Sequence, residues 1–292
     1  MTVTASLVKE MRDRTGLGMM ECKRALVESG GDIEAAIENM RKSGQAQADK
    51  KAGRVAADGV VAVASAPDNK AHLLVEVNCE TDFVAKDENF VAFADLVAAT
   101  ALAAGQTDID ALGGLAIAGE GTIEQARQAL ISKVGENVQI RRLALCEDPD
   151  SQFAVYQHGV RIGVVVQYRG GEEQLGRDLA MHIAASRPVC VQESDLSPEL
   201  IAKEREIYAA QAADSGKPDD IQQKMVDGRI RKFVGEVTLL GQPFVKDPDT
   251  KVEKLLRAAG AQVIRFVRLE VGEGIEKQES DFVAEVMEQA KS

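Results

Sequence analysis

The first 44 residues place apolar and polar positions with the period of amphipathic helices. The segment MMECKRALVES stands between glycine breaks at 15–18 and at Gly30-Gly31, and Asp32 can cap the segment IEAAIENMRKS that follows. The apolar positions of the first and third segments recur at i, i+3 and i+4, and they comprise Leu7, Val8, Met11, Ile33, Ala36, Ile37 and Met40. This pattern predicts a three-helix unit with a core so thin that an apolar surface on it would suit a partner.

From residue 60 the hydrophobic period changes to two, which indicates strands. The runs VVAVASA and AHLLVEVNC flank the turn signal Pro67-Asp68-Asn69-Lys70, so we expect a hairpin. A helix through about residue 104, a glycine-rich connection, a helix in TIEQARQALISKV and a strand in ENVQIRRLAL follow. The polar, alanine-rich stretch QAQADKKAGRVAADG before residue 60 is interpreted as a linker that could itself be helical.

The second half of the chain repeats this plan. The segment FAVYQHGVRIGVVVQY predicts another hairpin, EEQLGRDLAMHIAAS another helix, and VEKLLRAAG with AQVIRFVRLEV a closing helix and strand. Arg142-Leu143 aligns with Arg268-Leu269, which indicates a weak internal duplication. Within the second half, residues 198–213 and 219–240 predict two antiparallel helices joined by a short loop. A last amphipathic helix is expected in ESDFVAEVMEQA.

These elements predict an α+β fold, in a chain long enough for about two domains. The expected parts are an N-terminal three-helix module with its linker (1–55), a first core half (56–148), a second core half (149–190 and 240–270), an inserted helical hairpin (191–239) and a C-terminal helical module (271–292). Because the two core halves are related, we expect them to pack together.

Charge and hydropathy narrow the classes of partner. The 47 acidic and 35 basic residues give a net charge of -12, which disfavours broad binding to nucleic acids or membrane surfaces. The start MTVTASLVKEMRDRTG lacks the apolar region of a signal peptide, and no apolar run approaches the length of a membrane span. We therefore expect a cytoplasmic protein that binds neither nucleic acid nor membrane directly.

The cysteines and histidines predict neither disulfides nor a metal centre. Cys22, Cys79, Cys146 and Cys190 are widely scattered and form no C-x-x-C pair, which is typical of free, buried thiols in a reducing compartment. The three histidines are also far apart in the sequence, so a histidine-based metal site is not expected.

The stretch NCETDFVAKDENF, residues 78–90, is the strongest candidate for function. Its acidic residues, which surround the apolar pair Phe83-Val84, are Glu80, Asp82, Asp87 and Glu88. One hypothesis is a magnesium site, although the chain lacks the phosphate-cradling motifs GxxxxGK[ST] and GxGxxG. A second hypothesis is that Phe83 caps the core of the sheet, and a third is that the loop carries an apolar wedge into another protein. The pattern alone does not choose between the last two.

A resemblance to a known family favours the third hypothesis. The segments that carry it occur in order along nearly the whole chain: TASLVKEMRDRTGLGMMECKRAL, GDIEAAIENMRKSG, KKAGRVAADG, EVNCETDFVAKDENF, YQHGVRIGV, SGKP, GQPFV and FVRLEVGEGIEK. The segments TDFVAKD and RTGxGMM are the most specific. On these residues the chain resembles the bacterial translation elongation factor Ts family.

The resemblance implies a guanine-nucleotide exchange factor for the GTPase elongation factor Tu, with no covalent catalysis and no cofactor. It also implies an N-terminal module that resembles ubiquitin-associated domains, ahead of the two-part core. In the family the TDFV segment displaces magnesium from the GTPase, and the match assigns this role to Thr81, Asp82, Phe83 and Val84. Phe83 would be the wedge near the magnesium ion of the partner, and Asp82 its charged companion.

The resemblance further implies partner contacts outside the loop. Arg12, Met19 and Met20 should touch the GTPase domain, and His158 in the motif YQHG should meet another domain of the partner. Both methionines could instead belong to the core of the helical module, and His158 could be a turn residue without a partner. The contacts expected on the C-terminal helix are Phe282 and Val283.

Two other classes of function stay open at this point. An adaptor would bind through residues 1–44 alone, whereas a magnesium-dependent phosphoryl enzyme would turn over a nucleotide at the acidic loop. Assembly stays open as well, because the inserted hairpin could form a homodimer, contribute to a heterotetramer with elongation factor Tu, or stand alone.

Overall fold

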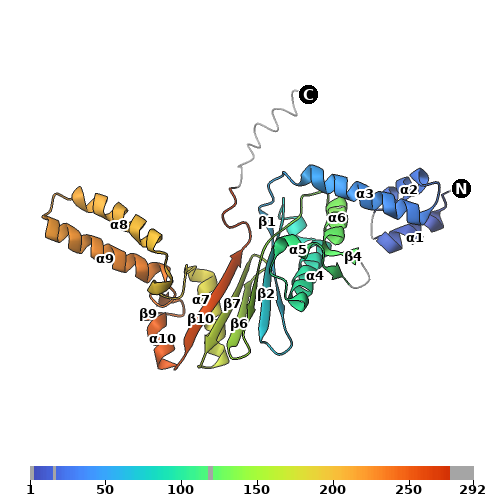
Figure 1. Ribbon diagram of the computed structural model, residues 1–292. Coiled ribbons are helices and arrows are strands. Elements are labelled where there is room, and N and C mark those ends of the chain that lie inside the picture. The colour runs from blue at the N-terminus through green and yellow to red at the C-terminus, as the bar shows by residue number, and fades with distance from the viewer. Residues whose placement is uncertain (1–2, 16–17, 118–120, 277–292) are drawn as a thin grey trace. The chain divides into compact units, whose positions relative to one another are not determined.

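The computed structural model describes residues 3–15, 18–117 and 121–276, which contain both helices and β-sheets, as the predicted α+β class requires (Figure 1). These residues divide into two compact units. The first holds those within 1–63, 75–143 and 270–292, and the second holds those within 64–74 and 144–269. No helix in the described ranges combines the length and the hydropathy that a bilayer crossing requires.

Three helices form the N-terminal part of the first unit: α1 (Ala5–Thr15), α2 (Met19–Glu28) and α3 (Ile33–Lys51). Asp32 caps α3 as predicted, since its side chain accepts a hydrogen bond from the backbone N–H of Ala35 at 3.1 Å. The predicted apolar faces pack into one core, which includes Leu7, Val8, Met11, Cys22, Leu26, Ile33, Ala36, Ile37 and Met40.

The third helix extends beyond residue 43 into the stretch interpreted above as a linker that could be helical. It continues to Lys51 through much of the expected linker, because alanine, glutamine and lysine are strong helix formers. Gly44 does not end the helix. It is buried, and a Cβ atom there would lie 3.3 Å from the hydroxyl of Ser132 in α6 (Ile123–Val134), so the glycine allows two helices to approach closely.

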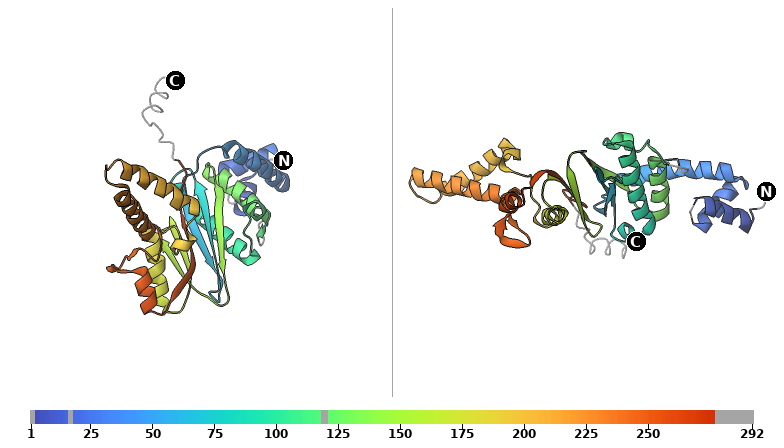
Figure 2. Two further views of the ribbon diagram at one scale, coloured as in Figure 1. Left: turned by 60° about the vertical axis from the view of Figure 1, so that its left-hand side comes forward. Right: turned by 90° about the horizontal axis from the view of Figure 1, so that it is seen from below.

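The first sheet has the strand order β1-β2-β5, with β1 (Asp58–Ser65), β2 (Ala71–Cys79) and β5 (Gln139–Glu147). Asn69 adopts the left-handed conformation, with a φ of 58°, in the turn that joins β1 to β2. The helices α4 (Glu88–Ala104) and α6 lie beside each other next to β2 (Figures 1 and 2). The apolar composition of α4 is explained by burial, since Phe90, Phe93 and Val97 are among its buried residues.

The glycine-rich connection between α4 and α6 holds more structure than predicted. It contains a short helix, α5 (Ile109–Leu112), and two paired strands of two residues each, β3 (Ala116–Ile117) and β4 (Gly121–Thr122). Elements this short span too few residues to show a hydrophobic period. Thr122 then caps α6 in a reciprocal capping box with Gln125.

The second sheet has the strand order β10-β7-β6, with β6 (Gln152–His158), β7 (Ile162–Arg169) and β10 (Gln262–Glu270). Strands β6 and β7 form the predicted antiparallel hairpin, in which His158 pairs with Ile162 beside the turn. The helices α7 (Glu173–Ser186) and α10 (Val252–Ala258) pack on these strands. The shared core includes Val164, Val166, Leu179, Ile183, Val252 and Leu256.

Two long helices of the second unit lie side by side, α8 (Pro198–Ala213) and α9 (Asp219–Val237) (Figure 2). Ser197 caps α8 and Pro198 occupies its first turn, as predicted. The buried apolar residues between the helices include Ala212, Val226, Ile230 and Val234. This unit also contains the 3₁₀ turn η2 (Glu193–Asp195) and the paired strands β8 (Pro243–Phe244) and β9 (Asp247–Lys251).

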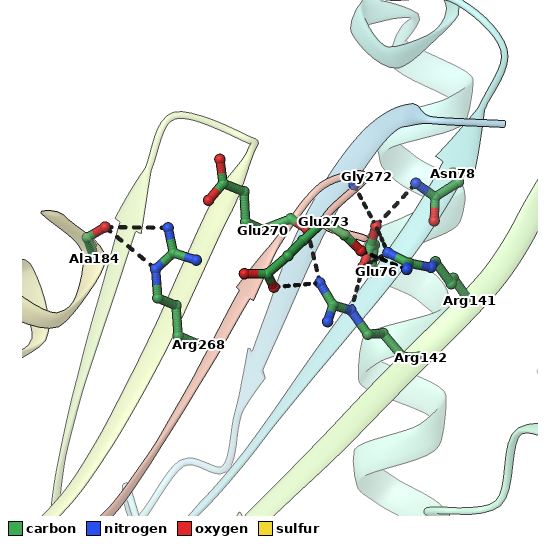
Figure 3. A network of polar contacts seen from close by, with 9 residues as sticks. All are labelled: Glu76, Asn78, Arg141, Arg142, Ala184, Arg268, Glu270, Gly272 and Glu273. Atoms are coloured by element: carbon green, nitrogen blue, oxygen red, sulfur yellow. Dashed lines mark hydrogen bonds and ion pairs between the residues drawn. The ribbon is translucent and has the colours of Figure 1, made fainter. Parts of the chain in front are cut away.

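A buried carboxylate in the first unit fixes the chain segment that follows β10 (Figure 3). The side chain of Glu76 in β2 accepts hydrogen bonds from the backbone N–H of Gly272 at 2.8 Å and from the guanidinium groups of Arg141 and Arg142. Arg142 also donates to the carbonyl of Glu270 at 2.9 Å. Burial by itself raises the pKa of Glu76, but the N–H of Gly272 and the guanidinium of Arg142 outweigh it and hold the pKa below its usual value.

The cysteines follow the prediction with one exception. Cys22, Cys79 and Cys146 are buried free thiols, whereas the free thiol of Cys190 is partly exposed. Cys190 lies in the connection between α7 and α8, and a connecting segment covers a side chain less completely than a sheet or helix core does.

Candidate functional site

Phe83 lies in the loop between β2 and α4, and 81% of its surface is exposed. The hypothesis that Phe83 caps the core of the sheet is therefore wrong. The buried side chains of this connection are those of Ala85 and, at the start of α4, Phe90. An exposed aromatic ring is a group that a pocket on a partner can bury with a large gain in apolar contact.

The turn that carries Phe83 is compact and unstrained. Phe83 has ordinary helical angles, φ -68° and ψ -49°, and precedes the 3₁₀ turn η1 (Val84–Lys86). The backbone N–H of Lys86 donates to the carbonyl of Phe83 at 3.2 Å, and that of Ala85 donates to the carbonyl of Thr81 at 3.2 Å. The side chains of Asp82 and Lys86 form an exposed ion pair at 2.7 Å. The chain thus presents the acid and the ring side by side on one ordered turn.

Glu136, located between α6 and β5, holds the start of this loop. Its Oε2 accepts hydrogen bonds from the backbone N–H groups of both Glu80 and Thr81, each at 3.0 Å, and its Oε1 accepts one from the hydroxyl of Thr81 at 2.6 Å. The hydroxyl of Thr81 in turn accepts the N–H of Val84 at 3.4 Å. Hydrogen bonds to a carboxylate are stronger than those between neutral groups, so this contact restrains the loop firmly.

A reciprocal contact joins Glu80 to the residue that follows Glu136. The Oε1 of Glu80 accepts the backbone N–H of Asn137 at 2.6 Å and lies 3.4 Å from the guanidinium of Arg54. The buried side chain of Asn137 donates to the carbonyl of Arg54 at 2.8 Å. Two segments that are 56 positions apart in sequence therefore exchange hydrogen bonds in both directions.

The two ends of the loop are also fixed. The thiol of Cys79 donates to the carbonyl of Thr81 at 3.2 Å, and burial together with nearby carboxylates raises the pKa of Cys79 to about 12, so the thiol stays protonated. Asp87 caps α4 by accepting the backbone N–H groups of Asn89 and Phe90. The side-chain amide of Asn89 and these N–H groups hold the pKa of Asp87 below its usual value, so the cap is charged at neutral pH.

The acidic side chains of the loop do not converge on one point. Asp82 forms an ion pair, Asp87 caps α4, Glu80 accepts a backbone N–H, and Glu88 is exposed. Within the part of the chain that the structure describes, no three His, Cys, Asp or Glu side chains are grouped so that they could hold a metal ion. The geometry therefore gives no support to a magnesium site formed by this loop.

The predicted contact residues of the N-terminal helices are exposed. Arg12 lies on α1, while Met19 and Met20 open α2 with exposed fractions of 57% and 77%. The alternative that both methionines belong to the core of these helices is wrong, because both side chains are exposed and the core is formed by other residues, among them the fully buried Met11. The side chains of Met19 and Met20 are free to contact a partner.

The remaining predicted contacts lie elsewhere in the chain. His158 belongs to the second unit, where it is exposed at the end of β6 and its Nδ1 lies 3.2 Å from the hydroxyl of Tyr156. Phe282 and Val283 lie outside the described residues. Among the predicted residues, the structure brings Thr81, Asp82, Phe83 and Val84 together in one turn.

No sequence pattern pointed to Glu136 or Asn137 as parts of this site. They follow Gly135, which ends α6 in the left-handed conformation, so the local sequence shows only a helix stop before a strand. Their contacts with the loop arise from tertiary structure, and a single sequence carries no local signal for them.

An exposed aromatic side chain on a loop held at several points is typical of a protein that acts by binding another macromolecule. Comparison with known proteins identifies the family, because the model described as Elongation factor TS matches residues 80–273, a stretch that begins in this loop. Elongation factor Ts of Thioalkalivibrio sulfidiphilus is 60% identical over 292 residues, which cover 100% of this chain and 99% of that relative.

Two further relatives give the same result. Elongation factor Ts of Methylococcus capsulatus is 56% identical over 296 residues, covering 100% of both chains. Elongation factor Ts of Legionella pneumophila is 53% identical over 291 residues, covering 100% of this chain and 99% of the relative. The chain belongs to the elongation factor Ts family, and it is thus a factor of translation elongation.

Proposed function

We propose that this chain binds elongation factor Tu in its GDP-bound form and promotes the release of GDP, so that GTP can bind in its place. Membership of the family supports both the partner and the exchange role. The observation that carries the proposal is the exposed ring of Phe83 on a loop that is hydrogen-bonded on both sides of it. In this proposal the chain makes and breaks no covalent bond and uses no cofactor.

The proposed mechanism acts on the magnesium and phosphate site of the GTPase. Bound magnesium and the phosphate-binding loop of a GTPase hold the β-phosphate together, so a wedge that shifts their supporting side chains weakens both. Phe83 supplies the wedge, with Val84 beside it, and Thr81 fixes the turn that carries them. Asp82 brings a negative charge that competes for the cation or for its solvation shell.

Exchange by this route is a linkage between two ligands of the GTPase. The factor binds nucleotide-free elongation factor Tu more tightly than the GDP-bound form, and GDP weakens the binding of the factor by the same ratio. Moving an equilibrium from 1:99 to 99:1 requires about 5.5 kcal/mol of differential binding free energy. One loop is too small to supply all of it, so the proposal includes contacts outside the loop.

We assign these further contacts to Arg12, Met19 and Met20 on the N-terminal helices and to His158 on the β6–β7 hairpin. All four side chains are exposed, and an imidazole at a hairpin turn can donate or accept a hydrogen bond. The assignment also includes Phe282 and Val283 on the C-terminal segment.

The proposal extends to the modules of the chain. The helices α1 to α3 are assigned to the ubiquitin-associated-like module (1–55), and α8 with α9 to the inserted hairpin (191–239). The other proposed parts are the core halves, 56–148 and 149–190 with 240–270, and the C-terminal module, 271–292. A homodimer, or a heterotetramer with elongation factor Tu, would form through the hairpin, and light scattering with and without residues 191–239 tests this.

The test of the proposed function follows the release of fluorescent GDP from elongation factor Tu, first in magnesium and then in excess EDTA. The native chain should accelerate release in magnesium, and the double variant Asp82→Ala/Phe83→Ala should lose most of this acceleration while binding persists in part. Chelation removes the same restraint that the loop is proposed to remove. The difference between the native chain and the double variant should therefore shrink in EDTA.

Two results would contradict parts of this proposal. A native chain that leaves the rate of GDP release unchanged would overturn the exchange function. A double variant that is as fast as the native chain would overturn the role of the loop and leave the exchange function in place.

A further inference from the structure

We propose that Glu136 is a positioning residue for nucleotide exchange, because it holds the backbone of Glu80 and Thr81 so that Phe83 is presented in an ordered turn. The inference rests on the proposed exchange function and deepens it. Part of the action of the loop is assigned to a side chain that lies 56 positions from Glu80 in sequence and outside the exposed turn itself.

The carboxylate of Glu136 receives three hydrogen bonds from the loop. The two backbone N–H groups belong to consecutive residues and point to the same oxygen, each at 3.0 Å, while the hydroxyl of Thr81 donates to the second oxygen at 2.6 Å. Consecutive N–H groups that converge on one anion fix the orientation of the peptide unit between them. A carboxylate in this place therefore determines the direction in which the chain enters the turn.

Thr81 transmits this restraint to Phe83. Its hydroxyl accepts the N–H of Val84 at 3.4 Å, and its carbonyl accepts both the N–H of Ala85 at 3.2 Å and the thiol of Cys79 at 3.2 Å. A shift of Thr81 would disrupt the turn on both sides of the aromatic ring. Without the carboxylate, the loop would have to become ordered in the step that displaces GDP, after the other contacts have formed, and that ordering costs free energy.

The role differs from direct contact and from simple stabilisation. The hydrogen bonds of Glu136 with the loop go to the backbone of Glu80 and Thr81 and to the hydroxyl of Thr81, so Glu136 acts on Phe83 through the segment that precedes it. Loss of a merely structural residue reduces the amount of folded factor. Loss of a positioning residue lowers the maximal rate of GDP release and leaves the binding contributed by the other contacts largely intact.

The experiment uses the full chain with Glu136→Ala, Glu136→Gln and a matched control, Glu88→Ala, which removes an exposed carboxylate from the same region. The rate of GDP release from elongation factor Tu, measured over rising factor concentration, separates the maximal rate from the half-saturating concentration. We expect Glu136→Ala to lower the maximal rate about tenfold, which corresponds to ~1.4 kcal/mol, and to change the half-saturating concentration less than about threefold.

The conservative variants sharpen the test. Glu136→Gln keeps one acceptor oxygen for the two N–H groups but loses the charge and the second acceptor oxygen, so its maximal rate should lie between those of Glu136→Ala and the native chain. Glu88→Ala should match the native chain. Thr81→Val removes the hydroxyl without changing the shape of the side chain, and it should add little to the loss already caused by Glu136→Ala. Amide hydrogen exchange of Glu80 and Thr81 should be about tenfold faster in Glu136→Ala than in the native chain.

The outcomes separate this inference from the proposed function. A native chain that fails to accelerate GDP release contradicts the proposed function itself. An active native chain together with an equally active, folded Glu136→Ala variant overturns only the inference about Glu136. If Glu136→Ala does not fold, Glu136→Gln decides: faster exchange of the loop amides with a lowered maximal rate supports the inference, and an unchanged loop with a lowered rate contradicts it.

Discussion

The carboxylate of Glu76 accepts the backbone N–H of Gly272 at 2.8 Å, across 196 positions of sequence (Figure 3). The same carboxylate is paired with Arg141 and Arg142 of β5. Because Glu76 is fully buried, these partners replace the water that a charged side chain would otherwise require. Glu76 therefore fixes the point at which the chain leaves β10 and begins its C-terminal segment.

Removal of this carboxylate should destabilise the protein strongly. Glu76→Ala removes the one carboxylate that two guanidinium groups and a backbone N–H share, and we expect the free energy of unfolding to fall by about 3–5 kcal/mol. The control is Glu273→Ala, which removes a half-exposed carboxylate that contacts the same Arg142 at 3.2 Å and should cost at most about 1 kcal/mol. Urea unfolding measures both, and equal losses in the two variants would refute the special position of Glu76.

The stability contributed by Glu76 should depend on pH in a defined direction. Its pKa in the folded protein lies below the ordinary value of 4.5, so the folded state binds a proton less readily than the unfolded chain does. The contribution is thus complete above the unfolded pKa and is lost as the pH falls through the folded pKa. Urea midpoints between pH 7 and pH 3 should decline less steeply for Glu76→Gln than for the native chain, whereas parallel curves would argue against this assignment.

Gly272 should tolerate a side chain less well than Gly274. Both have a left-handed backbone, with φ of 75° and 78°, but a Cβ atom at Gly272 would lie 2.3 Å from the carbonyl oxygen of Ala57, while the nearest atom at Gly274 is 3.9 Å away. We expect Gly274→Ala to lower the free energy of unfolding by about 1 kcal/mol, because alanine disfavours the left-handed backbone. Gly272→Ala should lower it by about 2 kcal/mol more, because the added Cβ atom also clashes. Thermal unfolding of the two variants checks this, and equal losses of stability would show that a side chain at position 272 does not clash with Ala57.

Met20 should matter for binding and little for folding. Its side chain is exposed, so Met20→Ala should change the free energy of unfolding by less than about 0.5 kcal/mol while weakening binding to nucleotide-free elongation factor Tu by about 1 kcal/mol. Met11→Ala is the contrasting variant, because Met11 is fully buried. It should lower the free energy of unfolding by roughly 2–5 kcal/mol, as large-to-small changes in a core do. Calorimetric titration measures the binding, and unchanged affinity of Met20→Ala would exclude it from the interface.

Much of the fold could be predicted because most helices and strands are long enough to show a period. The apolar residues of α3 from Ile33 to Met40 and the β6–β7 hairpin are examples. Burial of one face of a helix or strand directly imposes the spacing of its apolar residues. The two-residue strands β3 and β4 are too short for such a signal. The helix formers after Gly44 favour the extension of α3, but the close approach of Gly44 to Ser132 is a tertiary contact that no local pattern encodes.

The site was predictable only in part. The Phe83-Val84 pair in an acidic loop is visible in the sequence. The sequence is compatible, however, both with a Phe83 ring that is buried under the sheet and with one that is exposed to a partner. Burial of Ala85 and Phe90 in the same connection, and exposure of Phe83, are properties of the folded chain. The contact of Glu136 with Thr81 joins residues 55 positions apart, so no local sequence motif could predict it.

The central claim is that Phe83 is a wedge that acts on the partner and has little part in the folding of its own chain. The most direct test measures the maximal rate of GDP release from elongation factor Tu in magnesium with Phe83→Ala, alongside its thermal unfolding. Because the ring is exposed, the free energy of unfolding should stay within about 0.5 kcal/mol of the native value, while the rate should fall at least about tenfold. A folded Phe83→Ala chain that releases GDP as fast as the native chain would contradict the claim.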